Sequence, residues 1–467
     1  MADLPFLTDS AAQAVPIHAL RTAEWSQWSE SRPEALKRMA AAHDFKAQPG
    51  RILLVPATDG SIERVLFGVG DKANALSMGS LAQNLPSGDY RIAAAPREFS
   101  ATLVAVAWGL GAYAFERYKK RKRPAPKLAP PEGADMAEAQ RIVSAAWLVR
   151  DLVNTPTNDM GPDALHAAAE KVARENGAVF EAIVGDELIA QNYPLIHAVG
   201  RAAAQPPRLL HLSWGDAGAP RLALVGKGVT FDTGGLDIKP SAGMRLMKKD
   251  MGGAAHALAL AQAVMQSGLK VKLDVYLAVV ENAISADAFR PGDVIASRKG
   301  PTVEIDNTDA EGRLILADAL TRACEEEPVL LLDFATLTGA ARTALGPDLP
   351  PFFTGDDALA AELAQASIET ADPIWRMPLW DAYEGDMDSS IADMKNTGDG
   401  AFAGAIFGAL FLRRFVNVAS WAHFDVYAWA PREKPSRPQG GEAQALRACL
   451  KVIKARFGAA DAAPKAK

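Results

Sequence analysis

The stretch that decides the fold is RLALVGKGVTFDTGGLDIKPSAGMRLMKKDMGGAAHALALA, residues 221–261. It opens with a short apolar run, passes through a segment rich in glycine, and continues from about Gly252 as an alanine-rich, helix-favouring segment. Glycines in the middle allow tight turns and a close approach of the backbone to a ligand. The sequence therefore predicts a buried strand, a following loop that carries polar side chains, and a helix.

Other apolar runs recur between helix-like stretches: LLHLSW, KLDVYLAVV, VLLLDFAT and WAHFDVYAW. Continuous apolar runs of this kind are typical of strands that are buried on both faces of a sheet. We therefore expect an α/β protein with a small N-terminal α/β domain and a larger C-terminal α/β domain. The central sheet of the larger domain is predicted to be mixed, mostly parallel and flanked by helices.

The boundary between these domains is predicted at the segment RYKKRKRPAPKLAPPEG, residues 117–133. Its prolines and its lack of periodicity are typical of a linker. We assign residues 1–133 to the N-terminal domain with its linker and residues 134–467 to the larger C-terminal domain. The basic half of the segment could contact nucleic acid, but a solvated helix end is the simpler interpretation.

The composition is that of a globular protein, because 49% of the 467 residues are hydrophobic and 23% are charged. The formal net charge of −6 provides no general attraction to nucleic acid or to anionic lipid, so we expect neither as a partner. The longest apolar run, residues 101–115, is too short to span a bilayer.

A cytoplasmic location is expected from the cysteines and from the start of the chain. Cys324 and Cys449 are the two cysteines of the sequence, which excludes a disulfide framework and a thiolate zinc site. The opening MADLPFLTDS lacks the basic start and the long apolar core of a signal peptide. The end of the chain, GAADAAPKAK, is expected to be disordered.

A second charged stretch, IDNTDAEGRLILADAL at residues 305–320, carries Asp309, Glu311 and Arg313 at every second position. In an extended segment this spacing turns the three side chains to one side. Two neighbouring carboxylates repel each other unless a strong positive charge lies between them. The alternative is a solvated loop before a helix, with Asp309 as the N-cap and Glu311 in the first turn.

The acids of both charged stretches together suggest a metal site. These acids are Asp232, Asp250, Asp309 and Glu311. Their formal charge of about −4 matches two divalent cations, and carboxylate oxygens suit Mg²⁺, Mn²⁺ or Zn²⁺. The scattered histidines form no HExxH pair, which argues against an imidazole site. A phosphate-binding loop is the rival interpretation of the glycines, but the Walker A spacing is absent.

Lysine is an unusual neighbour for such acids. A neutral amine can bind a metal, and two adjacent cations lower the pKa of a lysine enough to allow this. A lysine that keeps its charge would instead stabilise a developing oxyanion. Hydrolysis by metal-activated hydroxide is therefore the reaction that these residues predict. The alternatives are another two-metal hydrolase, such as a phosphoesterase, and a binding or regulatory protein that retains the motif.

The motifs VGKGVTFDTGGLDIKP, KKDMGGAA and NTDAEGRL together resemble the leucyl aminopeptidase (cytosol aminopeptidase) family, peptidase family M17. Further matches are GAYAFERYK, LVNTPTNDMGP, RPGDV and ATLTGA. The resemblance is dense over residues 154–342 and looser elsewhere. It implies a two-metal aminopeptidase that hydrolyses N-terminal amino acids, with leucine-like residues preferred, from peptides with a free N-terminus.

The resemblance also implies which residues bind the metals and carry out the reaction. The implied metal ligands are Lys227, Asp232, Asp250, Asp309 and Glu311. Lys239 is implied to contact the hydroxide that bridges the metals and the substrate carbonyl. Arg313 is implied to hold a bicarbonate ion that acts as general base, with help from the backbone at Gly312 and Leu337.

Further implications concern the substrate, the cofactors and the assembly. The residues implied to surround the first side-chain pocket and the substrate backbone are Met247, Asn307, Thr336 and Gly339. The implied cofactors are bicarbonate and two divalent ions per subunit, Mn²⁺ or Zn²⁺, with Mg²⁺ as a further candidate. The implied assembly is a homohexamer. The late strand departs from the HxDIAG pattern of the family, because Tyr427 and Trp429 put large groups where small ones are common.

Overall fold

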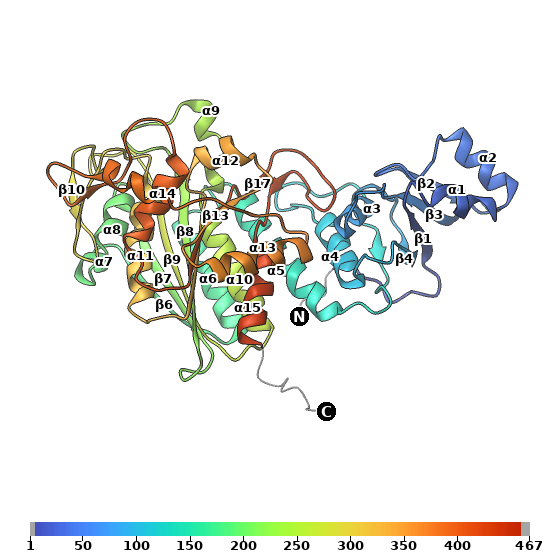
Figure 1. The fold of residues 1–467 in the computed structure, drawn as a ribbon, viewed down its shortest axis with the longest axis horizontal. Coiled ribbons are helices and arrows are strands. Elements are labelled where there is room, and N and C mark those ends of the chain that lie inside the picture. The colour runs from blue at the N-terminus through green and yellow to red at the C-terminus, as the bar shows by residue number, and fades with distance from the viewer. Residues whose placement is uncertain (1–4, 459–467) are drawn as a thin grey trace. The chain divides into compact units, whose positions relative to one another are not determined.

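The computed structural model describes residues 5–458 and divides into two compact units (Figure 1). The first unit comprises Met1–Trp147 with Arg432–Gln439, and the second comprises Leu148–Pro431 with Gly440–Lys467. The division falls inside helix α5 (Met136–Asn154), whereas the sequence placed its boundary at residue 133. That earlier boundary stays a prediction, and the segment 459–467, expected to be disordered, lies outside the described residues.

The first unit is built on a five-stranded sheet of order β2-β3-β1-β4-β5. Its strands are β1 (Val15–Leu20), β2 (Ile52–Pro56), β3 (Ile62–Gly68), β4 (Asp89–Ala94) and β5 (Lys127–Leu128). Its helices are α1 (Trp25–Glu30), α2 (Glu34–Ala42), the 3₁₀ helix η1 (Ala75–Met78), α3 (Gly79–Asn84) and α4 (Ala101–Gly111). The long apolar run forms α4, which is buried from Val104 onward, so core packing accounts for its composition.

The second unit contains an eight-stranded sheet of order β14-β13-β16-β12-β8-β9-β7-β6. Its strands are β6 (Val179–Val184), β7 (Arg208–Trp214), β8 (Arg221–Asp232), β9 (Lys272–Asn282), β12 (Leu330–Ala335), β13 (Pro351–Phe353), β14 (Trp375–Arg376) and β16 (Trp421–Asp425). The central strands β16, β12, β8 and β9 are parallel. Strands β7 and β13 pair antiparallel with β9 and β16, so the predicted mixed sheet is confirmed.

Helices cover both faces of this sheet, as Figure 1 shows. The helices of the second unit, besides α5, are α6 (Pro162–Asn176), α7 (Glu187–Ala190), α8 (Pro194–Gly200), α9 (Ser241–Met244), α10 (Gly252–Gln266), α11 (Glu311–Cys324), α12 (Gly339–Leu345), α13 (Asp357–Glu369), α14 (Gly404–Arg413) and α15 (Leu446–Phe457), with the 3₁₀ helices η2 (Met247–Lys249) and η3 (Asp381–Met387). Helices α6, α10 and α15 pack together on one side, and α8, α11 and α14 pack together on the other.

Two small sheets complete the second unit. Strands β10 (Val294–Ala296), β11 (Thr302–Glu304) and β15 (Met394–Lys395) form a three-stranded sheet. Strands β17 (Trp429–Ala430) and β18 (Gly440–Gly441) form an antiparallel pair. The run WAHFDVYAW, predicted as one strand, therefore forms β16 and β17, which belong to different sheets.

Glycines allow α10 to pack directly on the backbone of the central strands. A Cβ atom placed on Gly226 of β8 would lie 2.6 Å from the Cα atom of Ala254 in α10. A Cβ atom placed on Gly253 would lie 2.1 Å from the carbonyl oxygen of Phe334 in β12. Both separations are well inside van der Waals contact, so a side chain at either position would force α10 away from the sheet.

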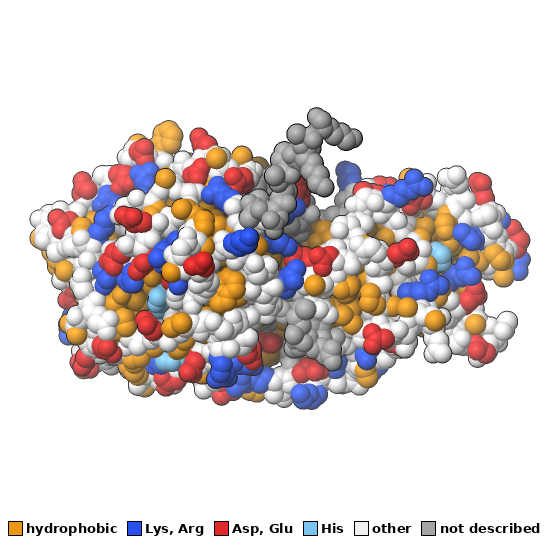
Figure 2. Space-filling model, turned by 90° about the horizontal axis from the view of Figure 1, so that it is seen from below, with side chains coloured by type: hydrophobic (Ala, Val, Ile, Leu, Met, Phe, Trp, Pro, Cys, Tyr) orange, Lys and Arg blue, Asp and Glu red, His pale blue; other side chains and the backbone are white. Residues whose placement is uncertain are grey.

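The surface carries charges of both signs. Figure 2 shows Lys and Arg side chains interspersed with Asp and Glu over the face in view. Along residues 5–458, no helix combines the length and the apolar character that a membrane crossing requires.

Candidate metal centre

The predicted site residues meet where β8 and β12 end and where α11 begins. Asp232 is the last residue of β8, and Lys227 lies five positions earlier in the same strand. Asp250 follows η2 directly, and Glu311 is the first residue of α11. Because β8 and β12 are parallel neighbours, their carboxyl ends bring these loops to one edge of the sheet.

One half of the site is a buried cluster around Lys227. Its Nζ atom lies 2.9 Å from Oδ2 of Asp250 and 2.8 Å from Oε1 of Glu311. It also donates a hydrogen bond of 3.2 Å to the carbonyl oxygen of Thr336. The hydroxyl of Thr336 donates to Oδ1 of Asp250 at 2.7 Å. Since the Lys227 and Asp250 side chains are each only 3% exposed, these contacts fix the lysine in a water-poor environment.

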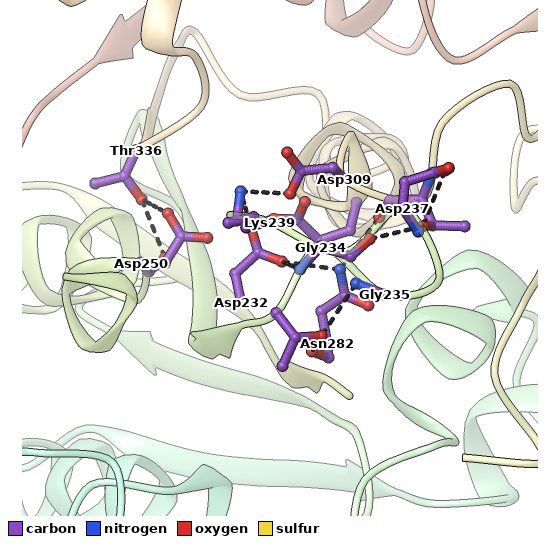
Figure 3. A network of polar contacts seen from close by, with 12 residues as sticks. Asp232, Gly234, Gly235, Asp237, Lys239, Asp250, Asn282, Asp309 and Thr336 are labelled. Carbon is purple, nitrogen blue, oxygen red and sulfur yellow. Dashed lines mark hydrogen bonds and ion pairs between the residues drawn. The ribbon is translucent and has the colours of Figure 1, made fainter. Parts of the chain in front are cut away.

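The other half of the site is centred on Lys239. Its Nζ atom lies 2.8 Å from Oδ2 of Asp232 and forms an ion pair with Asp309 (Figure 3). The second oxygen of Asp232 accepts hydrogen bonds of 2.9 Å from the amide of Gly234 and from Nδ2 of Asn282. The Lys239 side chain is 16% exposed, so this half is the more open one.

The stretch that carries Asp309 and Glu311 is a turn followed by a helix, so the extended conformation that would turn Asp309, Glu311 and Arg313 to one side is not formed. The amide of Asp309 donates to Oδ1 of Asn307 at 2.7 Å, which closes a turn, and α11 starts two residues later. The alternative in which Asp309 caps the helix is wrong, because the N-cap position is Ala310. The turn nevertheless brings the carboxylates of Asp309 and Glu311 close together, as the spacing of the two residues implied.

Gly312 and Arg313 lie behind these acids in the first turn of α11. A Cβ atom on Gly312 would lie 2.6 Å from Cδ and Cε of Lys227, so only glycine leaves room for that side chain. Arg313 is buried, and its Nη1 atom donates a 2.7 Å hydrogen bond to the carbonyl oxygen of Asn396. Within residues 5–458 its Nε atom has no hydrogen-bond partner.

Burial and mutual repulsion perturb the pKa values of the acids. Burial, with the charge of Asp232 in addition, raises the pKa of Glu311 to about 8 and that of Asp309 to about 6. Burial by itself lowers the pKa of Lys227, but the charges of Asp250 and Glu311 outweigh it and raise that pKa above the ordinary value. In this arrangement the two lysine ammonium groups therefore supply the positive charge between the carboxylates.

The donor set fits divalent cations. Carboxylate oxygens of Asp232, Asp309 and Glu311 lie within 4.8 Å of one another. Among the described residues, Oδ2 of Asp250, Oδ1 of Asp309 and Oε1 of Glu311 accept no hydrogen bond although they are buried. Each of these three oxygens forms an ion pair with a lysine ammonium group. Buried carboxylate oxygens without hydrogen bonds are suited to ligate Mg²⁺, Mn²⁺ or Zn²⁺.

A cavity of about 290 Å³ opens onto these residues. The predicted site residues that line it are Lys227, Asp232, Lys239, Met247, Asp250, Asn307, Asp309, Arg313, Thr336, Leu337 and Gly339. Glu311 and Gly312 do not line it, and Glu311 is only 1% exposed. Leu337 was predicted to help hold an anion through its backbone, and its amide donates to Oδ1 of Asp425 at 2.9 Å.

The sequence did not single out several residues that support the site. Asp425 accepts hydrogen bonds from the amides of Leu337 and Thr338 at 2.9 and 3.2 Å, and from the hydroxyl of Thr338 at 2.6 Å. Asp237 accepts a 2.8 Å bond from the amide of Thr308 and so ties the two charged stretches together. Both acids stood in quoted motifs, but their partners become visible only in three dimensions.

A two-unit α/β fold, with buried carboxylates and lysines gathered at the strand ends, defines the class of α/β metalloenzymes. Residues 147–450 match the catalytic domain of the cytosol aminopeptidase family, and residues 15–131 match the N-terminal domain of M17 aminopeptidases. The chain belongs to the cytosol aminopeptidase family, M17.

Individual relatives agree with this assignment. A probable cytosol aminopeptidase of Syntrophotalea carbinolica is 43% identical over 325 residues, which are 68% of this chain and 65% of that protein. A probable cytosol aminopeptidase of Rhodopseudomonas palustris is 38% identical over 84% of each chain. The first of these alignments spans less than two thirds of the relative's own length.

Solved structures are similar over nearly the whole chain. The crystal structure of the cytosol aminopeptidase from Coxiella burnetii superimposes with a TM-score of 0.92 at 43% identity, and covers 97% of this chain and 99% of its own. The bottromycin maturation enzyme BotP in complex with Mn superimposes with a TM-score of 0.85 at 32% identity, over 95% and 99%.

Proposed function

We propose that the protein is an aminopeptidase that releases N-terminal amino acids, leucine-like ones among them, from peptides. The observation that carries this proposal is a cavity at the strand ends that is lined by Lys227, Lys239 and three carboxylates, with the carboxylate of Glu311 buried against Lys227. Membership of the cytosol aminopeptidase family supports the same reaction. Peptides with a free N-terminus are therefore the proposed substrates.

The proposed cofactors are two divalent metal ions, Mn²⁺ or Zn²⁺. Their proposed ligands are Lys227, Asp232, Asp250, Asp309 and Glu311. When bound, such ions polarise a scissile carbonyl and activate water for attack. The buried carboxylate oxygens without hydrogen bonds support this assignment, as does the manganese bound in the BotP structure. Lys227 must lose its proton to act as a ligand, so a cation has to displace that proton.

Lys239 and Arg313 are proposed to assist the reaction through their charges. Lys239 lines the cavity and is partly exposed, so its ammonium group can stabilise negative charge that develops on the substrate carbonyl oxygen. Arg313 also lines the cavity, and its Nε atom has no hydrogen-bond partner within the described residues. We infer that Arg313 binds an anion in this cavity. The resemblance to the leucyl aminopeptidase family implies that this anion is bicarbonate, which would act as the general base.

The proposed setting is a homohexamer in the cytoplasm. Relatives are named cytosol aminopeptidases, which supports the location. Large apolar side chains are exposed in one segment of the second unit, namely Trp375, Trp380, Ile391 and Phe402. Exposed apolar groups of this size favour self-association. Light scattering coupled to size-exclusion chromatography measures the assembly directly, and a monomer at micromolar concentration would contradict it.

The proposed activity is tested with leucinamide and Leu-Gly in the presence of Mn²⁺. We expect release of leucine, loss of release with a chelator, and recovery when metal is restored. N-acetyl-Leu-Gly is the matched control, because an aminopeptidase requires a free amine. A protein that binds metal but cleaves none of a panel of free-amine peptides would refute the proposal. Hydrolysis of a phosphate ester in the same assay would instead favour a phosphoesterase.

A further inference from the structure

The cavity carries two further cationic side chains that the proposed reaction does not use. Lys249 is the last residue of η2, and Arg342 lies on α12. Both line the same cavity as the proposed metal ligands. Lys249 is only 2% exposed, and Arg342 is partly buried. Placing two more cations in a small, poorly hydrated space is costly unless an anion compensates them.

The ring of Tyr427 holds both cations at one wall of the cavity. The Nζ atom of Lys249 lies 5.2 Å from the ring centroid, and Cζ of Arg342 lies 4.6 Å from it. Contacts of this length between a cation and an aromatic ring are attractive. The backbone amide of Tyr427 donates to Oε1 of Gln444 at 2.9 Å, which anchors the backbone that carries the ring. The two cations therefore form one preorganised group, here called the cationic wall.

The protein provides little negative charge for the cationic wall. Within residues 5–458 Arg342 forms no ion pair, and it donates one hydrogen bond, of 3.1 Å, to the carbonyl oxygen of Thr338. The acid within ion-pair distance of Lys249 is Asp250, at 3.9 Å, and that carboxylate is already engaged by Lys227 at 2.9 Å.

A further acid, Asp425, acts on Lys249 through its charge, but both of its oxygens accept hydrogen bonds from the loop after β12. By contrast, Lys227 and Lys239 each contact two carboxylates. The cationic wall thus retains the capacity to bind an anion that enters the cavity.

We propose that Lys249 and Arg342 recognise a carboxylate on the N-terminal residue of the substrate, so that peptides beginning with glutamate or aspartate are preferred. This inference rests on the proposed aminopeptidase function. The wall adjoins the residues assigned to the first side-chain pocket. Met247 begins the 3₁₀ helix that Lys249 ends, and a Cβ atom on Gly339 would lie 3.6 Å from Nη2 of Arg342.

Guanidinium and ammonium groups bind carboxylates through charge-assisted hydrogen bonds, and Arg keeps its charge at every accessible pH. Such bonds contribute enough to change a rate constant by about tenfold to a hundredfold. An uncharged side chain of the same shape gains no such contact and leaves the cations without a counter-charge. Glutamate and glutamine are therefore the appropriate pair of substrates to compare.

The test uses the manganese-loaded protein and the amidomethylcoumarin derivatives of glutamate, glutamine and leucine. Their common leaving group carries no carboxylate, so only the N-terminal side chain varies. We expect kcat/KM for glutamate to exceed that for glutamine by about tenfold or more. Arg342→Gln should reduce this ratio by at least about tenfold, and Arg342→Lys should preserve part of it. Arg174→Gln, which removes an exposed arginine from α6, is the matched control and should leave the ratio unchanged.

Binding without turnover provides a second measurement. Free L-glutamate should inhibit leucine-amidomethylcoumarin hydrolysis more strongly than L-glutamine, and Arg342→Gln should remove the difference. If Arg342→Gln does not fold, Lys249→Met serves in its place, because Lys249 contacts the same ring. A glutamate preference that survives in the variant that folds would overturn the proposal.

Other outcomes separate this inference from the proposed function. Equal rates for glutamate and glutamine, together with hydrolysis of the leucine substrate, would refute the cationic wall as a specificity site but not the aminopeptidase. Failure to hydrolyse any of the three substrates would refute the proposed function itself. The cations could instead bind the carboxyl terminus of a dipeptide, and in that case Arg342→Gln would slow Leu-Gly but not Leu-Gly-amide. That result would also overturn the proposal.

Discussion

Replacing Gly312 by alanine should disable the metal centre while the fold survives. Gly312 is the second residue of α11, and a Cβ atom there would lie 2.6 Å from Cδ and Cε of Lys227 and 2.7 Å from its Nζ. Carbon atoms in favourable contact are about 3.5–4.0 Å apart, so the lysine or the helix must shift by roughly 1 Å.

Lys227 has little freedom to absorb this shift. Its Nζ atom is held by Asp250 and Glu311 at 2.9 and 2.8 Å, and it donates to the carbonyl oxygen of Thr336. Overpacking of this kind costs about 1–3 kcal/mol, whereas exchanging glycine for alanine in a helix returns up to about 1 kcal/mol. The net loss of stability should therefore be about 2 kcal/mol or less. A misplacement of about 1 Å in a catalytic group can reduce a rate about a hundredfold.

The assay compares leucine release, bound manganese and thermal denaturation for Gly312→Ala and a control. Gly243→Ala is the control, because it also adds a methyl group to a glycine in a helix, and its Cβ atom would lie 3.7 Å from Cγ of Pro240, an ordinary contact. We expect weak metal binding and at least about a hundredfold slower turnover only in Gly312→Ala. If Gly312→Ala binds manganese normally and keeps its rate within about threefold, the reasoning about Lys227 is refuted.

Further predictions concern the acids, the coupling of metal binding to protons, and stability against acid. Asp309→Ala and Lys239→Ala should each give a folded protein, by circular dichroism, that has lost nearly all turnover, and an unchanged rate in either would contradict its assigned role. Because Glu311 has a pKa of about 8 and Lys227 a raised pKa, cation binding must release protons, so affinity should rise between pH 6 and pH 8. Calorimetry in two buffers of different ionisation enthalpy measures that release, and identical heats would argue against it. Burial lowers the pKa of His256 to about 4, so on acidification this imidazole is protonated in the unfolded chain before it is protonated in the folded protein. Up to about 3 kcal/mol of the free energy of unfolding should therefore be lost as the pH falls from 6.5 to 4. Denaturant unfolding across this range tests it, and His256→Gln should flatten the dependence.

The pattern of apolar runs was sufficient to predict the central strands of the larger sheet but not β6, β13 and β14, because only strands buried on both faces need continuous apolar residues. Strands β7, β8, β9 and β12 each overlap a quoted run. The turn at Asp309 could not be predicted from the spacing of charged residues. It is closed by a hydrogen bond from the amide of Asp309 to the side chain of Asn307. The periodicity of a sequence predicts only regular helices and strands, so it does not predict a turn that a side chain closes.

The proposed metal ligands could be named from the sequence because they stand in three motifs that together resemble one family. The cationic wall could not, although KKDMGGAA contains Lys249 and Arg342 follows ATLTGA. Neither cation is unusual until its neighbours are known, and the neighbour that joins them, Tyr427, comes from a distant segment. The sequence shows that Tyr427 departs from the HxDIAG pattern of the family. That its ring contacts Lys249 and Arg342 becomes visible only in three dimensions.

Asp425 links the support of the cationic wall to that of the proposed metal ligands. Its carboxylate holds the amide and hydroxyl of Thr338, and the same hydroxyl accepts a hydrogen bond from the amide of Ala341 and so caps the helix that carries Arg342. The same carboxylate accepts a hydrogen bond from the amide of Leu337, whose neighbour Thr336 contacts both Lys227 and Asp250. Substrate preference is therefore more safely redesigned, and can drift in evolution more freely, through Arg342 on α12 than through Asp425, on which both groups depend.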